Sequence, residues 1–203
     1  DLLWLEPSAS NNPIMNLVSA LPPTSFETER LTVRRCDPAF TDNLFEAARD
    51  SVKELYPFLP WCHPGYRISD ASQWLKFAVN QWDSGAAFGF SIFSKQDGRL
   101  IGGCGVNLLD DHPTANLGYW IRTGMTGQGI ATEATLGLAD FAFRHVGLLR
   151  LEIILSVKNT ASRKVAIKTG AEFEGTLRNR LLLHGQCHDA YLYSLIPEQR
   201  KTA

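Results

Sequence analysis

The spacing of hydrophobic residues divides the chain into strand-like and helix-like segments. Leu31 and Val33 alternate with polar neighbours, which predicts a strand over 30–35. The same criterion predicts the remaining segments: helices over 37–52, 69–82, 130–145 and 160–170, and strands over 87–94, 100–109, 116–121, 149–157, 176–183 and 189–196. This order predicts a mixed α/β fold in which a strand–helix–strand unit interrupts a meandering sheet.

Local signals refine some of these segments. Ser69 with Asp70 is expected to cap the second predicted helix, and Gly147 is expected to end the third. The segment 149–157 is rich in Leu, Ile and Val, which predicts a strand that is covered on both faces.

The composition is that of an ordinary globular domain. Of the 203 residues, 44% are hydrophobic and 20% are charged. The net charge of −1 gives no electrostatic drive toward nucleic acid or an anionic membrane. Apolar runs stay well short of the ~20 residues that a membrane-spanning helix needs. We therefore expect a cytoplasmic domain, monomeric or homodimeric, without a nucleic-acid or membrane partner.

Both ends of the chain are expected to lie outside the domain. Residues 1–25 are rich in Asn, Pro and Ser and lack a basic region, which predicts a flexible leader and argues against a signal peptide. Met15 is a candidate natural start within it. The domain is predicted over 26–197, with a short tail over 198–203.

The cysteines lie far apart and contain no C-x-x-C pair, so their spacing does not predict a zinc or thioredoxin-like site. Buried thiols in a reducing compartment are the simplest expectation for all of them, namely Cys36, Cys62, Cys104 and Cys187. We therefore expect no metal.

A glycine-rich segment between a strand and a helix is the first candidate for chemistry. Gly124, Gly127 and Gly129 follow the strand over 116–121, and glycine allows left-handed backbone angles and close approach to a ligand. The first amides of the next helix have no partner within the helix, so the junction can cradle a phosphate. A tight turn that merely requires glycine is the alternative.

A dinucleotide-binding fingerprint competes for the same segment. It requires G-x-G-x-x-G/A, whereas this segment ends in Thr132. It also requires an acidic residue at the end of the next strand, and Glu152 lies near the start of that strand. Both differences argue against this alternative.

Several motifs together resemble one family. The segment Gly127, Gln128, Gly129, Ile130, Ala131, Thr132 resembles the cofactor motif of the GNAT acetyltransferases, Q/R-x-x-G-x-G/A, with Thr126 in place of the usual Gln or Arg. Other segments are similar to elements of the RimJ/RimL branch of that family, and these are 28–34, 59–61, 118–121, 159–162, 168–171 and 185–189. The resemblance covers about 26–197.

The resemblance implies a GNAT fold and acetyl-CoA as donor. In that fold a mostly antiparallel central sheet splays at the two strands flanking the cofactor helix, and helices cover both faces. The pyrophosphate would be held by the backbone of residues 127–132, and the pantetheine arm would lie between the strands over 116–121 and 149–157. A backbone amide near Trp120, Ile121 and Arg122 would bind the acetyl oxygen.

The resemblance also implies roles at the start of the helix over 160–170. Asn159 would contact the pantetheine amide or cap the helix. Ser162 would contact or protonate the leaving thiol, because Ala166 occupies the place where many family members carry a tyrosine. Alternatively, Ser162 hydrogen-bonds its own backbone.

The acceptor site is less well defined by the sequence. Trp61 is a candidate lid over the acceptor or, equally, part of an aromatic cluster that packs the two N-terminal helices. Tyr119, Asn107 and His188 are candidate acceptor contacts. No general base is evident, and the acidic segment 110–112 is better explained as a polar loop.

The predicted activity is acetyl transfer from acetyl-CoA to a primary amine by direct attack in a ternary complex. The α-amino group of a protein or peptide N-terminus is the leading acceptor. The alternatives are a small amine or an aminoacyl or peptidyl nucleotide toxin, a silent acyl-CoA sensor, and a dinucleotide oxidoreductase.

Overall fold

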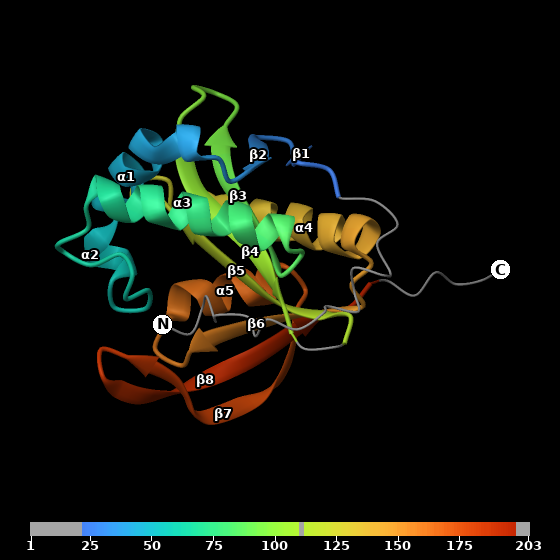
Figure 1. The fold of residues 1–203 in the computed structure, drawn as a ribbon. Coiled ribbons are helices and arrows are strands. Elements are labelled where there is room, and N and C mark those ends of the chain that lie inside the picture. Colours follow the sequence, from blue (N-terminus) through green and yellow to red (C-terminus); the bar gives the residue numbers. More distant parts are fainter. Residues whose placement is uncertain (1–21, 110–111, 198–203) are drawn as a thin grey trace.

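The computed structural model describes residues 22–109 and 112–197, in which eight strands form one mixed sheet (Figure 1). The strand order is β1-β2-β3-β4-β5-β6-β8-β7. The strands are β1 (Ser25–Glu27), β2 (Leu31–Arg35), β3 (Ala87–Ser94), β4 (Leu100–Leu108), β5 (Thr114–Ile121), β6 (Arg150–Ser156), β7 (Glu172–Leu183) and β8 (Gln186–Leu195). Only β5 and β6 are parallel neighbours among these strands.

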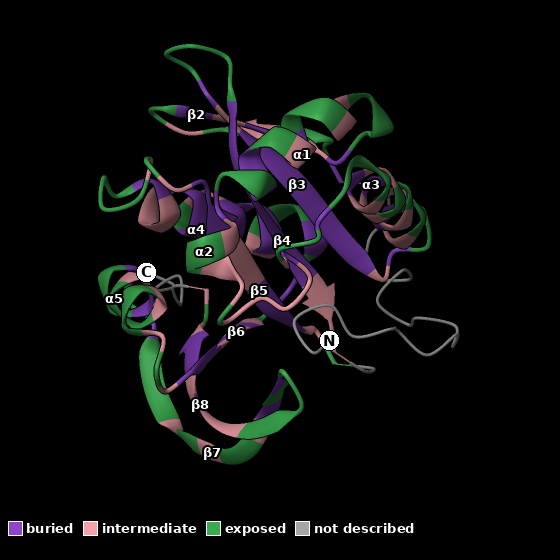
Figure 2. Ribbon diagram, turned by 90° about the vertical axis from the view of Figure 1, so that its left-hand side faces the viewer, coloured by how far each residue is buried: buried purple, intermediate pink, exposed green. Residues whose placement is uncertain are grey.

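Helices cover both faces of the sheet (Figures 1 and 2). The helices are α1 (Thr41–Arg49), α2 (Val52–Leu55), α3 (Ile68–Asp83), α4 (Ile130–Phe141) and α5 (Thr160–Lys168), with a 3₁₀ turn η2 (Pro38–Phe40) and a π turn η3 (Ala142–Val146). Helices α1 and α3 lie on one face, and α4 and α5 lie on the other. The predicted mixed, mostly antiparallel sheet with two helical layers is therefore confirmed.

Each face has its own hydrophobic core. Leu138 on α4 and Leu151 on β6 are fully buried in the core beneath α4. Leu75 on α3 is fully buried in the other core, where Trp120 of β5 also packs. Full burial of one such side chain stabilises the fold by about 2 kcal/mol. Strand β5 thus contributes to both cores, which fixes its position between the two layers.

The N-terminal helical region differs from the prediction. The expected helix over 37–52 is divided into η2, α1 and α2. The interruption falls at Ser51, which is fully buried and donates from Oγ to the carbonyl oxygen of Ala47 at 2.7 Å. The same Oγ accepts a hydrogen bond from the amide of Thr123 at 3.0 Å. A contact from a distant loop therefore determines where the helix breaks.

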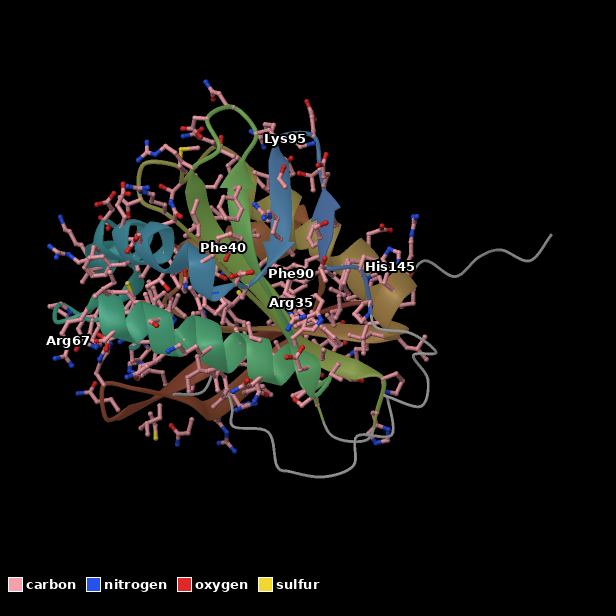
Figure 3. All side chains as sticks on the ribbon, turned by 45° about the horizontal axis from the view of Figure 1, so that its top comes forward. Arg35, Phe40, Arg67, Phe90, Lys95 and His145 are labelled. Carbon is pink, nitrogen blue, oxygen red and sulfur yellow. The ribbon has the colours of Figure 1, made fainter. Side chains whose placement is uncertain are left out.

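Helix α3 begins at Ile68, one residue before its predicted start at Ser69. Arg67 occupies the N-cap position, at the outer end of the helix (Figure 3), and its amide donates to Asp70 Oδ2 at 2.7 Å. Asp70 is thus the third helical residue, reaching back to the cap. The prediction that Ser69 with Asp70 caps the helix was wrong. Asp70 lies within the first turn, and its carboxylate accepts a hydrogen bond from the amide of the N-cap residue Arg67.

Three further details adjust the sequence predictions. Strand β1 was not predicted, and it begins at Ser25, one residue before the expected domain boundary. Strand β6 is buried on its α4 side, whereas Glu152 and Ile154 on the other face are only partly buried, so it is not covered equally on both faces. Gly147 has φ +77° and ends the helical region, as expected.

The cysteines of the described chain are all free thiols. Three of them are buried, as expected, but Cys187 on β8 is exposed. None of the helices in the described ranges is long and apolar enough to cross a membrane. The predicted leader before residue 22, the loop residues 110 and 111, and the tail over 198–203 lie outside the described residues.

The close approach of strands β4 and β5 at Gly102 allows a prediction about stability. A Cβ at Gly102 would lie 2.3 Å from the carbonyl oxygen of Trp120, whereas a Cβ at Gly118 would meet no atom within 4 Å. Gly102→Ala is expected to lower the free energy of unfolding by about 3 kcal/mol, because a backbone atom must move. Gly118→Ala is expected to change it by less than about 0.5 kcal/mol. Urea denaturation of both variants tests this, and equal losses would contradict it.

Candidate active site

The glycine-rich loop between β5 and α4 has the backbone geometry that a phosphate cradle needs. Gly124, Gly127 and Gly129 have φ values of +86°, +77° and +80°. Gly129 is the N-cap of α4 and has no side chain to occupy the first helical amides. A Cβ at Gly124 or Gly127 would meet no atom within 4 Å, so this side of the loop is open. The amides of 130–132 are therefore left for an anion at the helix N-terminus.

A cluster that sequence analysis missed holds the helix end of this loop. Arg30 donates from Nη1 to the carbonyl oxygen of Gln128 at 2.9 Å and from Nε to Glu133 Oε2 at 2.6 Å. Thr28 Oγ1 and the amide of Arg30 both donate to Glu133 Oε1. Thr28 and Arg30 were noted only as part of a motif, because pairing across about 100 residues leaves no local signal.

Arg122 holds the strand end of the loop and does not present its side chain to a cofactor. Its guanidinium, 8% exposed, bonds Glu46 Oε1 at 2.8 Å and also pairs with Asp50. Its amide donates to the carbonyl oxygen of Ile101 at 2.8 Å. Both polar groups are thus committed to the fold, so the structure removes Arg122 from the predicted amide donors.

The direction of the β5 amides distinguishes the two candidate amides that remain, those of Trp120 and Ile121. Successive amides of a strand point to opposite sides, so the Arg122–Ile101 bond places the amides of Tyr119 and Ile121 on the side away from β4. That side faces β6. Within the described chain β5 and β6 pair only over 114–116 and 150–152, and the strands then diverge. The amide of Ile121 therefore points into the opening, whereas the amide of Trp120 points to β4.

The first turn of α5 brings together two predicted residues and a tyrosine. Asn159 is the N-cap of α5, and its Oδ1 accepts a hydrogen bond from the amide of Ser162 at 3.0 Å. Ser162 Oγ lies 2.9 Å from the hydroxyl oxygen of Tyr119 on β5. Burial raises the pKa of Tyr119 to about 12, and the bond to Ser162 opposes that effect. Tyr119, predicted as an acceptor contact, thus lies with Ser162.

Two predicted acceptor contacts lie far apart. Asn107 on β4 lies opposite Asn116 on β5, at the end of the opening where β5 and β6 still pair. Across the sheet, the same row continues through Glu152 on β6 to Ser194 on β8. His188 lies six residues along β8 from Ser194, which corresponds to about 20 Å. The structure therefore does not bring Asn107 and His188 together.

Trp61 belongs to an aromatic cluster. Its ring packs edge-on against Trp120 and Tyr66, each with 5.7 Å between ring centroids. Trp61 Nε1 and the Tyr66 hydroxyl are buried without a hydrogen-bond partner in the described chain. Of the two sequence interpretations, the geometry favours packing of the helical layer over a lid that is free to move.

Asn116 was not predicted as a site residue. Its Oδ1 is buried and has no hydrogen-bond partner within the described residues. The next residue on the same face of β5 is Gly118, where a Cβ would meet open space. An unpartnered acceptor thus lies beside an open strip of strand.

The carboxylates on this face near the closed end are already paired. Arg150 donates from Nε to Glu152 Oε1 at 3.0 Å and from Nη1 to Glu174 Oε1 at 2.7 Å. Ser194 Oγ donates to Glu174 Oε1 at 2.6 Å. Hydrogen bonds from Arg150 and Ser194 lower the pKa of Glu174 to about 2. Within the described residues no group of three or more His, Cys, Asp or Glu side chains is placed to hold a metal ion.

The fold and this site define an acetyltransferase. A family model described as an acetyltransferase (GNAT) domain matches residues 30–172, so the chain belongs to the GNAT family, as its motifs indicated. It is therefore an acetyl-CoA-dependent N-acetyltransferase.

Named relatives and a solved structure agree with this assignment. The chain is 30% identical over 173 residues to the uncharacterized N-acetyltransferase p20 of Bacillus licheniformis, covering 85% of this chain and 96% of the relative. It is 28% identical over 167 residues to the ribosomal-protein-serine acetyltransferase of Escherichia coli, covering 75% and 91%. The structure of the microcin C7 self-immunity acetyltransferase, with acetyl-CoA and AMP, has a similar fold, with a TM-score of 0.80 at 23% identity over 87% and 98% of the two chains.

The residues present fit acetyl-CoA. The open glycine loop and the uncapped start of α4 suit a pyrophosphate, and the opening between β5 and β6 exposes backbone groups that an amide-bearing arm can pair with. Thr126, which replaces the usual Gln or Arg of the motif, is exposed in the loop.

The role of the glycine loop in binding CoA can be tested at Gly127, with Gly147 as a matched control. Gly127 and Gly147 both have φ +77° and open space at the Cβ position, so alanine costs each site a similar backbone strain. Both Gly127→Ala and Gly147→Ala should lose about 1 kcal/mol of stability, but only Gly127→Ala should weaken CoA binding, by about tenfold or more. Calorimetric titration with CoA tests this. Equal CoA affinity in the two variants would mean that the loop is only a turn.

The Arg30–Glu133 ion pair makes a pH prediction. Burial opposes ionisation of Glu133, but hydrogen bonds from Thr28 and Arg30 outweigh it and lower its pKa. A lowered folded-state pKa contributes stability above the unfolded value of about 4.3, and this is lost as pH falls through the folded value. Glu133→Gln should therefore cost about 1–2 kcal/mol at pH 7, a difference that shrinks below about pH 4.3.

Urea denaturation across this pH range measures the effect. Asp140→Asn is the control, because Asp140 lies on the same helix and pairs with Arg144 on the surface. That exposed pair should contribute less than about 0.5 kcal/mol. A Glu133→Gln difference that is independent of pH would contradict the prediction.

Proposed function

We propose that the acetyl acceptor is the α-amino group of a protein or peptide N-terminus. The E. coli relative is named as an acetyltransferase of a ribosomal-protein serine, which supports a protein acceptor. The structural observation that carries the proposal is the pairing of Glu152 and Glu174 with Arg150. The hydrogen bonds from Arg150 and Ser194 that lower the pKa of Glu174 make that carboxylate a poor proton acceptor.

An acceptor that meets no strong base must bring its own neutral amine. At pH 7.5 about a third of α-amino groups are neutral, against about one lysine side chain in a thousand, given reference pKa values of roughly 7.7–8.0 and 10.4. The site therefore favours α-amino groups by about two orders of magnitude before any contact is made. This preference supports an N-terminal acceptor over a lysine.

The chain's own groups take the following roles in the proposal. Acetyl-CoA supplies the reactive thioester. The backbone of residues 127–132 binds its pyrophosphate, and the Ile121 amide donates to the carbonyl oxygen where negative charge develops. Ser162 contacts the sulfur, and Asn159 orients Ser162 through its amide.

The acceptor approaches from the α1–α3 face of β5. Asn116 Oδ1 offers an unpartnered hydrogen-bond acceptor that an amine N–H satisfies, and Gly118 leaves room beside it. Asn107 pairs with Asn116 across the strands and belongs to the same end of this face. His188 lies outside this local set.

A nucleotide-linked amine is a weaker second candidate. The microcin self-immunity structure contains AMP, and Trp61 is an aromatic side chain of the kind that stacks on a base. Here, however, the Trp61 ring packs against Trp120 and Tyr66, and its Nε1 is buried. Stacking on a base would require this cluster to open.

The proposal predicts the pH dependence of catalysis. The kcat/KM for a peptide with a free N-terminus should rise with pH and level off above about 7.7–8.0, the pKa of the substrate amine. The same peptide with a blocked N-terminus and one lysine should react about 100-fold more slowly at pH 7.5. Mass spectrometry of peptide and small-amine panels with acetyl-CoA measures both. Turnover confined to small amines would overturn the N-terminal acceptor.

A further inference from the structure

A hydrogen bond between two hydroxyl groups crosses from β5 to α5. Tyr119 OH lies 2.9 Å from Ser162 Oγ, where either hydroxyl can donate, and 3.3 Å from the Ser162 carbonyl oxygen, so Oγ is the nearer of two possible acceptors for the single tyrosine hydrogen. Tyr119 lies three residues beyond Asn116, the last residue of β5 that pairs with β6, and so belongs to the part of β5 where the two strands have diverged. The two hydroxyls therefore lie beside the opening into which the Ile121 amide points.

Ser162 is held on two sides. Asn159 Oδ1 accepts from its amide at 3.0 Å, and the Tyr119 hydroxyl contacts its Oγ. A serine in the first turn of a helix commonly hydrogen-bonds its own backbone. When the tyrosine hydroxyl donates to Ser162 Oγ, the serine hydrogen is free for a third partner.

We propose that Tyr119 is a positioning residue for acetyl transfer, which fixes the Ser162 hydroxyl so that its hydrogen points into the β5–β6 opening and bonds the departing sulfur. The neutral amine nitrogen forms a bond to the acetyl carbon, the carbon–sulfur bond breaks with its electron pair staying on sulfur, and Ser162 stabilises that charge by a hydrogen bond. The amine proton is lost to solvent. The proposal rests on acetyl-CoA as donor and is independent of which amine accepts the acetyl group.

The protons of the pair stay on oxygen. The pKa of Tyr119, about 12, lies well above that of a thiol, which is roughly 8.5 for cysteine, so transfer of its proton to a thiolate is unfavourable. Tyr119 also remains protonated throughout the assay range. A fall of activity between pH 7 and 10 would therefore not come from this tyrosine.

Binding of CoA and of desulpho-CoA, which lacks the sulfur, isolates the proposed contact. In the wild-type protein CoA should bind more tightly than desulpho-CoA at pH 10, where a larger share of the thiol is ionised. In Tyr119→Phe this preference should fall by about 10- to 100-fold, the effect of losing a hydrogen bond to a charged group, with desulpho-CoA affinity unchanged. Calorimetry provides this readout without turnover or an acceptor.

Kinetics with acetyl-CoA give the second readout. Tyr119→Phe should lower kcat by about tenfold with an unchanged KM for acetyl-CoA, because the contact strengthens as the sulfur gains charge. Ser162→Ala should have a similar effect. The double variant should be no worse than Ser162→Ala, since the tyrosine acts through the serine.

Tyr193→Phe is the matched control. Tyr193 is buried on β8, and its hydroxyl accepts a hydrogen bond at 3.2 Å from Arg163, the next residue of α5. Removal of the Tyr193 hydroxyl should alter neither the preference for CoA over desulpho-CoA nor kcat. The proposal is overturned if Tyr119→Phe keeps the wild-type preference, or weakens CoA and desulpho-CoA equally. A chain that acetylates small amines but no peptide would refute the proposed acceptor alone.

Discussion

The divergence of β5 and β6 is the constraint on which the site depends. They are the only parallel neighbours among the described strands, and α4 forms the crossover between them. Their pairing ends at Asn116, which leaves backbone groups of Tyr119 and Ile121 without a strand partner in that direction. Backbone polar groups need partners when solvent is excluded. The fold thus builds a slot that an extended, amide-bearing ligand completes.

Two ion-pair clusters keep the ends of the adjoining loop in place. Arg30 and Glu133 bind the helix end to the start of β2, and Arg122 binds the strand end to α1. The glycines between them can adopt left-handed angles freely, so the loop would otherwise lose substantial entropy on binding a ligand. Because both ends are anchored, the loop loses much of this conformational entropy when the chain folds, and less of it when a ligand binds.

The sequence predicted what local patterns determine. The strand predicted over 87–94 matches β3, and the glycine at 147 ends the α4 region, as predicted. Sequence analysis failed where contacts between distant residues determine the local structure. The break at Ser51 depends on Thr123, and Arg122 turns from the ligand toward α1. The tyrosine that meets Ser162 comes from a strand 43 residues earlier, so inspection of α5 alone could not find it.

The proposed reaction needs no ionisable side chain as catalyst among the described residues. In the proposed reaction the amine loses a proton and the thiolate gains one. With pKa values of roughly 7.7–8.0 and 8.5, water can carry that proton at little free-energy cost. The arginine-bound carboxylates and the buried Tyr119 then serve geometry and hydrogen bonding. A lysine side chain has a pKa near 10.4, so almost none of it is neutral at pH 7.5 and its proton is lost to water at a much higher free-energy cost. In the proposed reaction the acidity of the acceptor amine thus discriminates between substrates before the shape of the acceptor face does.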